Sequence, residues 1–241
     1  MISVELSSQS SGIGRNTTEL PSILLHPRTP INHQTVIYMS IKRTTVIFEK
    51  GGEEHTEETL KIALEGAKER KIDTVLISTS TGGTGLKALD IFKDSGLKLV
   101  FVRHQTGYPF KGKQMMPSEV KAKLEKAGTI VTCTDVLTGG VDVGVGRQRP
   151  EKEQQLEASL PFIVPPVNVV IANMLRQFSQ GMKVGIEIAM MAADCDAVGI
   201  DKPVVSIGGS HAGADTAIVV TPAASNRIRE LRIHEILAKP Y

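Results

Sequence analysis

The chain has 241 residues, of which 41% are hydrophobic and 22% charged, as in ordinary globular proteins. Its net charge of +2 gives no electrostatic reason to expect nucleic acid or an anionic membrane as a partner, and its 4% of aromatic residues offer little for stacking on bases. No apolar run approaches the roughly 18 residues that cross a bilayer. We expect a protein with no nucleic-acid and no membrane partner; whether it forms a homo-oligomer stays open.

The two cysteines, Cys133 and Cys195, lie far apart in the sequence, and neither belongs to a C-x-x-C pair. This usage suits a reducing compartment better than a disulfide framework, so we expect a cytoplasmic location. The six histidines are scattered, with no pair at metal-ligand spacing. We therefore expect no metal site.

Residues 1–40 differ in composition from the rest of the chain, since Ser, Thr, Asn, Gln and Pro dominate them. Such a stretch buries too little apolar surface to offset its ordering entropy, which predicts a disordered extension. Met39 stands just ahead of the first clear strand, and we expect translation to start there naturally. Residues 41–241 are predicted to form the folded domain.

From residue 44 onward, strand and helix patterns alternate. Apolar runs predict strands, and apolar residues at helical spacing predict helices, the first of them with Thr56 as its N-cap. The expected strands are 45–48, 74–77, 97–102 and 129–132, and the expected helices are 56–70, 84–94 and 117–128. Repeated strand–helix units indicate parallel pairing. The predicted fold is an α/β three-layer αβα sandwich with a mostly parallel central sheet.

The second half of the chain begins with a glycine-rich stretch over 139–146 and a long amphipathic helix over about 167–180. Residues 183–188 alternate apolar and polar side chains, which predicts a strand, and 189–193 then become helical. Three further strands are expected at 204–207, 217–220 and 233–237.

The stretch from Ser78 to Gly85, with sequence STSTGGTG, is the most informative part of the chain because it connects a buried strand to a helix. The first amides of a helix have no partner within it, and glycines let a phosphate approach the backbone. Hydroxyl groups add further donors. The stretch therefore predicts a phosphate-binding loop, although the same residues also form ordinary turns.

Ligands of parallel sheets bind beyond the carboxyl ends of the strands, so the loops at 51–52, 78–85, 104–110 and 208–214 should converge there. His104, Tyr108 and Phe110 then either stack on a planar ring or pack against the protein. The loop from Gly208 to Asp215 either approaches the ligand or simply connects two strands. Glu187 is either a carboxylate of the pocket or a group on the far face of its strand.

Other chemistries fit the sequence less well. The Walker motif G-x-x-x-x-G-K-[ST] is absent. Gly208–Ala212 resembles the nucleophile elbow of serine hydrolases, but it ends in Ala and a strand pattern follows. The sequence Gly83-x-Gly85-x-x-Ala88 satisfies the relaxed dinucleotide fingerprint. The next strand, however, ends in Arg103–His104 instead of an acid, so an NADP-dependent oxidoreductase is only an alternative.

The run from His55 to Thr84 resembles the C-terminal α/β domain of pyruvate kinase. The likeness rests on Thr56–Glu57 opening a helix and on Thr79-x-Thr81-Gly82-x-Thr84 after a buried strand. In that family the pattern T-x-[ST]-G-x-[ST]-A forms an effector loop that binds a sugar phosphate; here Gly85 replaces the final Ala. The catalytic barrel of pyruvate kinase has no counterpart, so the protein is not expected to be a pyruvate kinase.

From Thr44 onward the chain also resembles stand-alone, uncharacterised microbial proteins built on this domain. The matching motifs are 55–60, His104-x-Thr106-Gly107, Met116–Pro117, 184–187, 191–194 and 213–217. The likeness implies a phosphorylated planar ligand such as FMN. A flavin-dependent oxidoreductase is then one activity open to the protein, and a non-catalytic sensor of a sugar phosphate or nucleotide is the alternative.

No acid, base or nucleophile can be assigned from the sequence. The residues expected to bind the ligand are Thr56, Ser78, Thr79, Ser80, Thr81, Gly82, Gly83, Thr84, His104, Thr106, Gly107, Glu187, Gly208, Gly209, Ser210 and Asp215.

Overall fold

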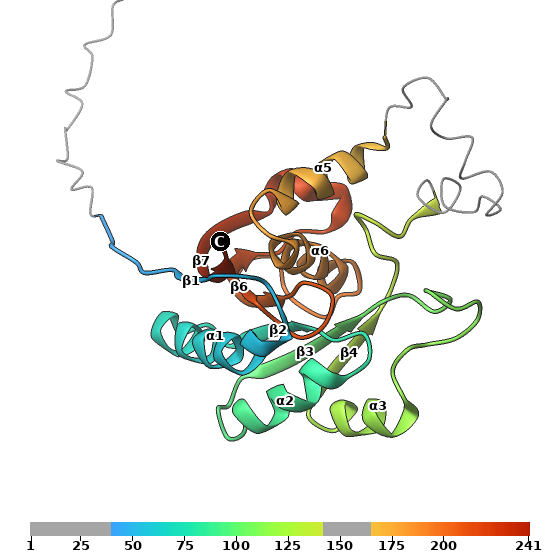
Figure 1. Cartoon of the computed structure of the whole chain (residues 1–241), viewed down its shortest axis with the longest axis horizontal. Coiled ribbons are helices and arrows are strands. Elements are labelled where there is room, and N and C mark those ends of the chain that lie inside the picture. The colour runs from blue at the N-terminus through green and yellow to red at the C-terminus, as the bar shows by residue number, and fades with distance from the viewer. Residues whose placement is uncertain (1–39, 142–164) are drawn as a thin grey trace, which may run out of the picture. The chain divides into compact units, whose positions relative to one another are not determined.

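A seven-stranded sheet with the strand order β1-β7-β6-β5-β2-β3-β4 forms the centre of the fold (Figure 1). Strand β6 is antiparallel to both of its neighbours, and the other pairs are parallel. The strands are β1 (Val46–Phe48), β2 (Thr74–Ser78), β3 (Lys98–Arg103), β4 (Gly128–Thr132), β5 (Val204–Gly208), β6 (Thr216–Thr221) and β7 (Arg232–Pro240). The predicted α/β class with a mostly parallel sheet is confirmed.

The computed structural model describes residues 40–141 and 165–241. Nearly all of the expected N-terminal extension and most of the glycine-rich stretch over 139–146 lie outside the described residues. Residues Arg43–Tyr241 cluster into one unit. No helix within the described ranges is long and apolar enough to cross a membrane.

Helices cover both faces of the sheet because successive residues of its buried central strands point to opposite sides. Val75 and Ile77 of β2 belong to the core shared with α1 and α2, whereas Leu76 between them packs in the core shared with α6. The helices are α1 (Thr56–Arg70), α2 (Gly83–Ile91), α3 (Ser118–Glu125), α5 (Val167–Arg176) and α6 (Gln180–Asp194). The near-continuous apolar run of a central strand thus contributes alternate side chains to the two hydrophobic cores, one on each face of the sheet.

The strand expected over 183–188 is wrong, because these residues lie inside α6. The single helix expected over 167–180 is also divided: α5 ends at Arg176, and α6 begins at Gln180. Ser179 marks the boundary, since its backbone is extended and its hydroxyl accepts a hydrogen bond from the amide of Met182. This is an N-cap, which starts a new helix instead of continuing the old one.

Small residues let α6 lie very close to β5 and β6. A Cβ atom added to Gly208 of β5 would stand 2.4 Å from the carbonyl oxygen of Gly181 and 2.9 Å from the amide nitrogen of Gly185. Because both contacts are with the backbone of α6, no rotation of a side chain relieves them. Gly208 was expected to bind a ligand, but it does not line the cavity described below. Its place in the structure is explained by helix packing.

We predict that Gly208→Ala lowers the free energy of unfolding by about 1–3 kcal/mol, because α6 must move away from the sheet. The matched control is Gly199→Ala, since a Cβ atom at exposed Gly199 meets nothing within 4 Å. The chain has no Trp, so urea unfolding followed by circular dichroism measures both variants. Equal midpoints for the two would contradict the packing argument.

The two cysteines lie near each other in space although they are far apart in the sequence. Cys133 follows β4 and is half-buried, and Cys195 caps the end of α6 and is exposed. Burial, with an added contribution from the neighbouring Cys195, raises the pKa of the Cys133 thiol to about 12. Cys133 is therefore protonated at neutral pH and is a weak nucleophile.

We predict that iodoacetamide at pH 8 alkylates Cys195 well before Cys133. The thiolate is the reactive form, and a pKa of about 12 leaves almost none of it at Cys133. Peptide mass spectrometry over a time course measures the order, and Cys195→Ser identifies the fast site. Faster labelling of Cys133 in the folded protein would contradict this prediction. In urea, where neither thiol is buried, the two cysteines should be alkylated at similar rates.

Candidate functional site

A cavity of about 580 Å³ opens where the strand order changes direction. The chain runs from β2 outward to β3 and β4 and then returns to β5 on the other side of β2. The loops that follow β2 and β5 diverge at such a point, and ligands of open α/β sheets bind in the crevice between them. The volume is within the usual range for small-molecule sites.

Three of the four loops expected to converge line this cavity, whereas the 51–52 turn is represented only by residues that follow it. The lining includes Glu53 and Thr56 after the 51–52 turn, Ser78–Thr81, Gly83 and Thr84 after β2, His104, Tyr108 and Pro109 after β3, and Gly209 and 211–213 after β5. It also includes Arg103, which the sequence suggested only for the NADP alternative, and residues that were not expected to bind: Lys87, Met115, Asp135, Thr138, Arg176, Gln180, Lys183, Val184, Ile188 and Met191.

The loop between β2 and α2 presents a series of backbone donors to this cavity. The amides of Ser80, Thr81, Gly82, Gly83 and Thr84 meet no acceptor within the described residues, whereas the next amide, that of Gly85, donates to the Thr79 hydroxyl over 3.0 Å. Gly82 has φ 98°, a left-handed conformation that favours glycine and that turns the chain into α2. The N-terminus of α2 thus offers its partial positive charge to the cavity.

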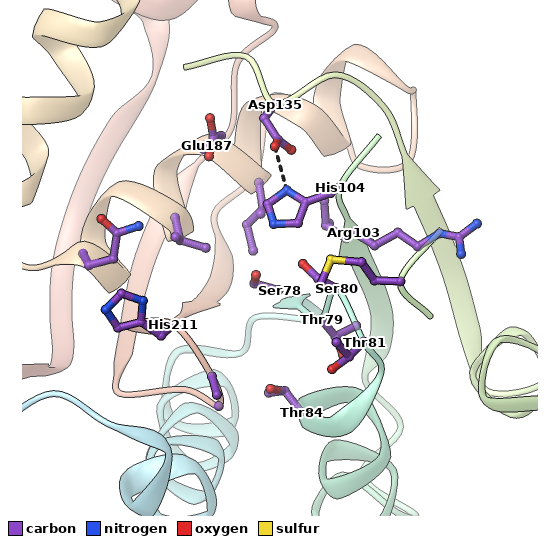
Figure 2. A pocket seen from close by; sticks show the side chains of 18 of the residues that line it. Ser78, Thr79, Ser80, Thr81, Thr84, Arg103, His104, Asp135, Glu187 and His211 are labelled. Atoms are coloured by element: carbon purple, nitrogen blue, oxygen red, sulfur yellow. Dashed lines mark hydrogen bonds and ion pairs between the residues drawn. The ribbon is translucent and has the colours of Figure 1, made fainter. Parts of the chain in front are cut away.

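Hydroxyl groups surround these amides, and Figure 2 shows them on the same side of the cavity. Thr84 is only 8% exposed, and its hydroxyl has no hydrogen-bond partner within the described residues although it lines the cavity. Because this hydroxyl lines the cavity and no other described residue bonds to it, it is available to a ligand as a hydrogen-bond donor or acceptor. Lys87, one turn into α2, adds a positive charge at the same wall.

Thr56 and Asp215 instead hold the loops in place. Thr56 is the first residue of α1 and not its N-cap, which is His55. Its hydroxyl donates to the carbonyl of Glu53 over 2.6 Å and accepts from the amide of Ala214 over 3.0 Å. Thr56 therefore ties the loop after β5 to the start of α1, even though it also borders the cavity.

Asp215 is fully buried and does not line the cavity. One carboxylate oxygen accepts from the amides of Gly52 and Ser210, each over 3.1 Å, and the other accepts from the hydroxyl of Thr216. Asp215 thus joins two cavity loops to each other. Ser210 takes part through its backbone and lies outside the lining, as does Gly82.

Thr106 and Gly107, also expected to bind, belong to a loop after β3 that closes on itself. The side chain of Gln114 donates to the carbonyl of His104 and to the hydroxyl of Thr106. Gly107 has φ 100° and donates its amide to Lys113. Neither Thr106 nor Gly107 lines the cavity, whereas Tyr108 does. Their role is to shape the loop that carries His104 and Tyr108.

The wall opposite the β2–α2 loop comes from α6. Val184, Ile188 and Met191 give it an apolar surface, and Lys183 and Glu187 are charged but almost fully buried, at 3% and 4% exposure. Glu187 is therefore a carboxylate of the cavity wall, carried by a helix. Lys183 and Glu187 form an ion pair, and Lys183 also donates to the hydroxyl of Thr138 over 2.7 Å.

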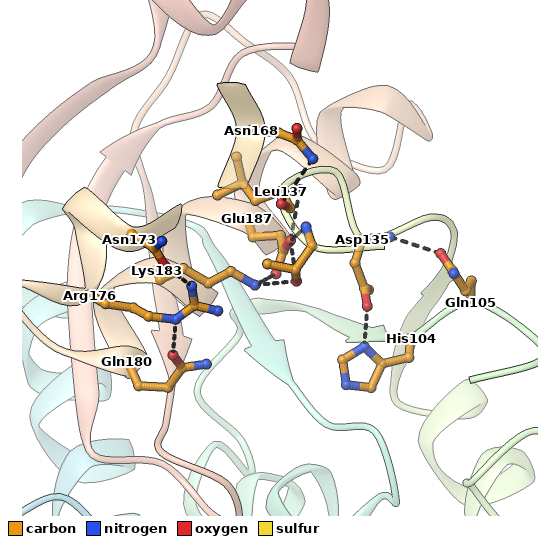
Figure 3. Close-up of polar contacts among 11 residues, drawn as sticks. His104, Gln105, Asp135, Leu137, Asn168, Asn173, Arg176, Gln180, Lys183 and Glu187 are labelled. Atoms are coloured by element: carbon orange, nitrogen blue, oxygen red, sulfur yellow. Dashed lines mark hydrogen bonds and ion pairs between the residues drawn. The ribbon is translucent and has the colours of Figure 1, made fainter. Parts of the chain in front are cut away.

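Glu187 has a second set of partners, which Figure 3 shows together. Its other carboxylate oxygen accepts from the amide of Leu137 over 2.8 Å and from the amide of Thr138 over 3.1 Å. The side chain of Asn168 on α5 donates to the carbonyl of Leu137. The turn after β4 is thus fastened to α5 and α6, and Asp135 lies in that turn.

Asp135 and His104 form a close pair at the edge of the cavity (Figures 2 and 3). Nδ1 of His104 is 2.6 Å from a carboxylate oxygen of Asp135, whose side chain is 7% exposed while that of His104 is 36% exposed. The centre of the Tyr108 ring lies 4.9 Å from the centre of the His104 imidazole, and the two ring planes make an angle of 59°. Sequence reasoning identified His104 but not its partner.

Arg103 lines the cavity with part of its side chain, but its guanidinium turns toward β4, where Nε donates to the Thr132 hydroxyl over 2.6 Å. Burial lowers the pKa of this guanidinium from its ordinary value. Arg103 was the residue whose position at the end of its strand suggested contact with the 2′-phosphate of NADP. Its orientation gives that alternative no support.

No protein-family model matches the chain. The resemblance to the C-terminal domain of pyruvate kinase therefore stays a prediction. The described ranges contain no group of three or more His, Cys, Asp or Glu residues arranged to hold a metal ion.

We predict that Glu187→Gln lowers the free energy of unfolding by about 3 kcal/mol, because it leaves the Lys183 ammonium buried without its counter-charge. The side-chain carbonyl of Gln can still accept from the amides of Leu137 and Thr138, so the loss of stability reports the loss of the negative charge. The control Glu65→Gln, at an exposed position of α1, should change stability by less than about 0.5 kcal/mol.

The double variant Lys183→Met with Glu187→Gln should regain most of the lost stability, since no isolated charge is left in the core. Chemical unfolding followed by circular dichroism measures all of these variants. If the double variant were less stable than Glu187→Gln alone, the charge argument would be wrong.

Proposed function

We propose that this protein binds a phosphorylated small molecule in the cavity between the loops after β2 and β5, with the phosphate on the β2–α2 loop. The observation that carries the proposal is the series of amides from Ser80 to Thr84, which meet no acceptor in residues 40–141 and 165–241 and belong to a loop that lines a cavity. A dianionic phosphate satisfies several such donors at once and is favoured by the positive end of the α2 dipole.

Two further observations support a phosphate. The Thr84 hydroxyl lines the cavity and has no partner among the described residues, and Lys87 supplies a full positive charge beside the loop. Glycine at position 83 leaves the approach open, because an added Cβ atom would meet only the Thr81 hydroxyl, at 4.0 Å. The site is therefore accessible as well as electropositive.

The organic part of the ligand would lie against α6. Val184, Ile188 and Met191 offer an apolar wall, and the rings of His104 and Tyr108 stand at one side. Such a surface suits a planar group. We propose FMN as the ligand, and we place the protein in a reducing compartment such as the cytoplasm.

The test is a titration of the protein into FMN, followed by flavin fluorescence, with riboflavin as the matched ligand that lacks the phosphate. FMN should bind at least about tenfold more tightly than riboflavin, which corresponds to about 1.4 kcal/mol from the phosphate contacts. Inorganic phosphate should compete with FMN. Equal affinities for the two flavins, or binding of neither, would contradict the proposed site.

A pair of variants at Gly83 tests the location. Gly83→Asp introduces a negative charge into open space at the first turn of α2, where it favours the helix but repels the phosphate. Gly83→Asn has nearly the same shape without the charge. We predict that Gly83→Asp weakens FMN binding about tenfold or more and Gly83→Asn less than about threefold. Unchanged binding by Gly83→Asp would place the phosphate elsewhere.

A further inference from the structure

The His104–Asp135 pair has the geometry of a general base. Because the Asp135 carboxylate accepts at 2.6 Å, the neutral imidazole carries its proton on Nδ1 and keeps a lone pair on Nε2. Nε2 has no hydrogen-bond partner within the described residues, and His104 lines the cavity. A carboxylate that fixes the tautomer and orientation of a histidine is the arrangement used to activate water or a hydroxyl group.

Asp135 is itself held from several directions, so the pair is pre-organised. The amide of Asp135 donates to the side-chain carbonyl of Gln105 over 3.1 Å, and the amide group of Gln105 donates to the carbonyl of Gly139 over 3.0 Å. The carbonyl of Asp135 accepts from the amide of Gly139 over 2.7 Å. Together with the anchoring of Leu137 and Thr138 to Glu187, these bonds fix the turn on which Asp135 lies.

The sheet places this pair beside the phosphate loop. Ser78 of β2 is paired with Val102 of the parallel strand β3. Ser80 and His104 each follow two residues later, so they leave the sheet next to each other at its carboxyl edge, on strands about 4.8 Å apart. Figure 2 shows the imidazole of His104 above the side chains of Ser78 and Ser80. A phosphate on the amides that begin at Ser80 would have His104 at its flank.

We infer that the cavity hydrolyses a phosphate monoester, with His104 as the general base and Asp135 as its positioning residue. Water attacks the phosphorus and gives its proton to Nε2 of His104. The bond from phosphorus to the ester oxygen breaks, and that oxygen keeps the electron pair and takes up a proton from solvent water. His104 returns its proton to solvent, so the products are an alcohol and inorganic phosphate.

Charge that develops on the phosphoryl oxygens is stabilised by the amides of the β2–α2 loop and by Lys87, which are already in place before the reaction. This inference rests on the proposed phosphate site, but not on FMN as the organic group. It goes beyond binding because it makes the cavity an active site.

The experiment measures the hydrolysis of p-nitrophenyl phosphate by the full chain, together with phosphate release from FMN. His104→Ala should lower kcat by about 100-fold or more, with KM changed less than about threefold. Asp135→Asn should act in the same direction, since an Asn amide can donate to Nδ1 and so reverse the tautomer of the ring. The control is His234→Ala, at an exposed position of β7, which should leave kcat unchanged.

Affinity for inorganic phosphate, measured by calorimetry on the same proteins, separates the two proposals. Retained phosphate binding with lost hydrolysis in His104→Ala and Asp135→Asn supports the inference. A wild-type protein that binds phosphate but hydrolyses neither ester overturns it and leaves a non-catalytic sensor. Full activity in His104→Ala overturns it as well. Absence of phosphate binding by the wild-type protein would overturn the proposed function itself.

Discussion

The close approach of α6 to the centre of the sheet is the constraint on which the cavity depends. Glycine at positions 181, 185 and 208 removes the side chains that would otherwise separate the helix from β5 and β6. The helix can then bring Lys183, Val184 and Glu187 to the carboxyl edge of the sheet, where they face the loop after β2. A helix held further out would leave that loop open to solvent.

The polar interior around α6 connects elements that come from distant parts of the sequence. Glu187 joins its own helix to the turn after β4, and that turn carries Asp135, which in turn contacts His104 after β3. On the other side, Asp215 joins the turn after β1 to the loop after β5. Buried carboxylates therefore fix the positions of loops that would otherwise vary, and each is satisfied by amides or cations.

The sequence predicts much of this architecture but misses features that depend on contacts between distant segments. The strand–loop–helix at 74–91 is found from its sequence because its apolar run, its glycines and its helical spacing all agree. Residues 183–188 are predicted as a strand because α6 is buried on nearly all sides and lacks the usual polar face of a helix. Val184, Ile186 and Ile188 alternate with residues that are also buried, and this alternation resembles that of a strand. Lys183 and Glu187 pair with each other and therefore give no sign of exposure.

Asp135 has only a faint sequence signal. It follows the fourth expected strand within three residues of its end, and the carboxyl ends of parallel strands share one edge. Only the strand order, with β4 next to β3, shows that it meets His104. The amides of the β2–α2 loop, by contrast, follow from local geometry alone, since the start of every helix leaves its first amides without partners.

The pairing of β1 with β7 has a consequence for the order in which the chain folds. Val46 lies beside Ala238, so this contact joins the two ends of the compact unit. During synthesis the short strand β1 has to wait until nearly all of the chain has emerged, whereas β2, β3 and β4 pair with neighbours close in sequence. Closing so long a loop costs entropy before any contact compensates for it, so β1 joins the sheet late. The edge that it covers, formed by β7, is then exposed to other chains until folding is complete.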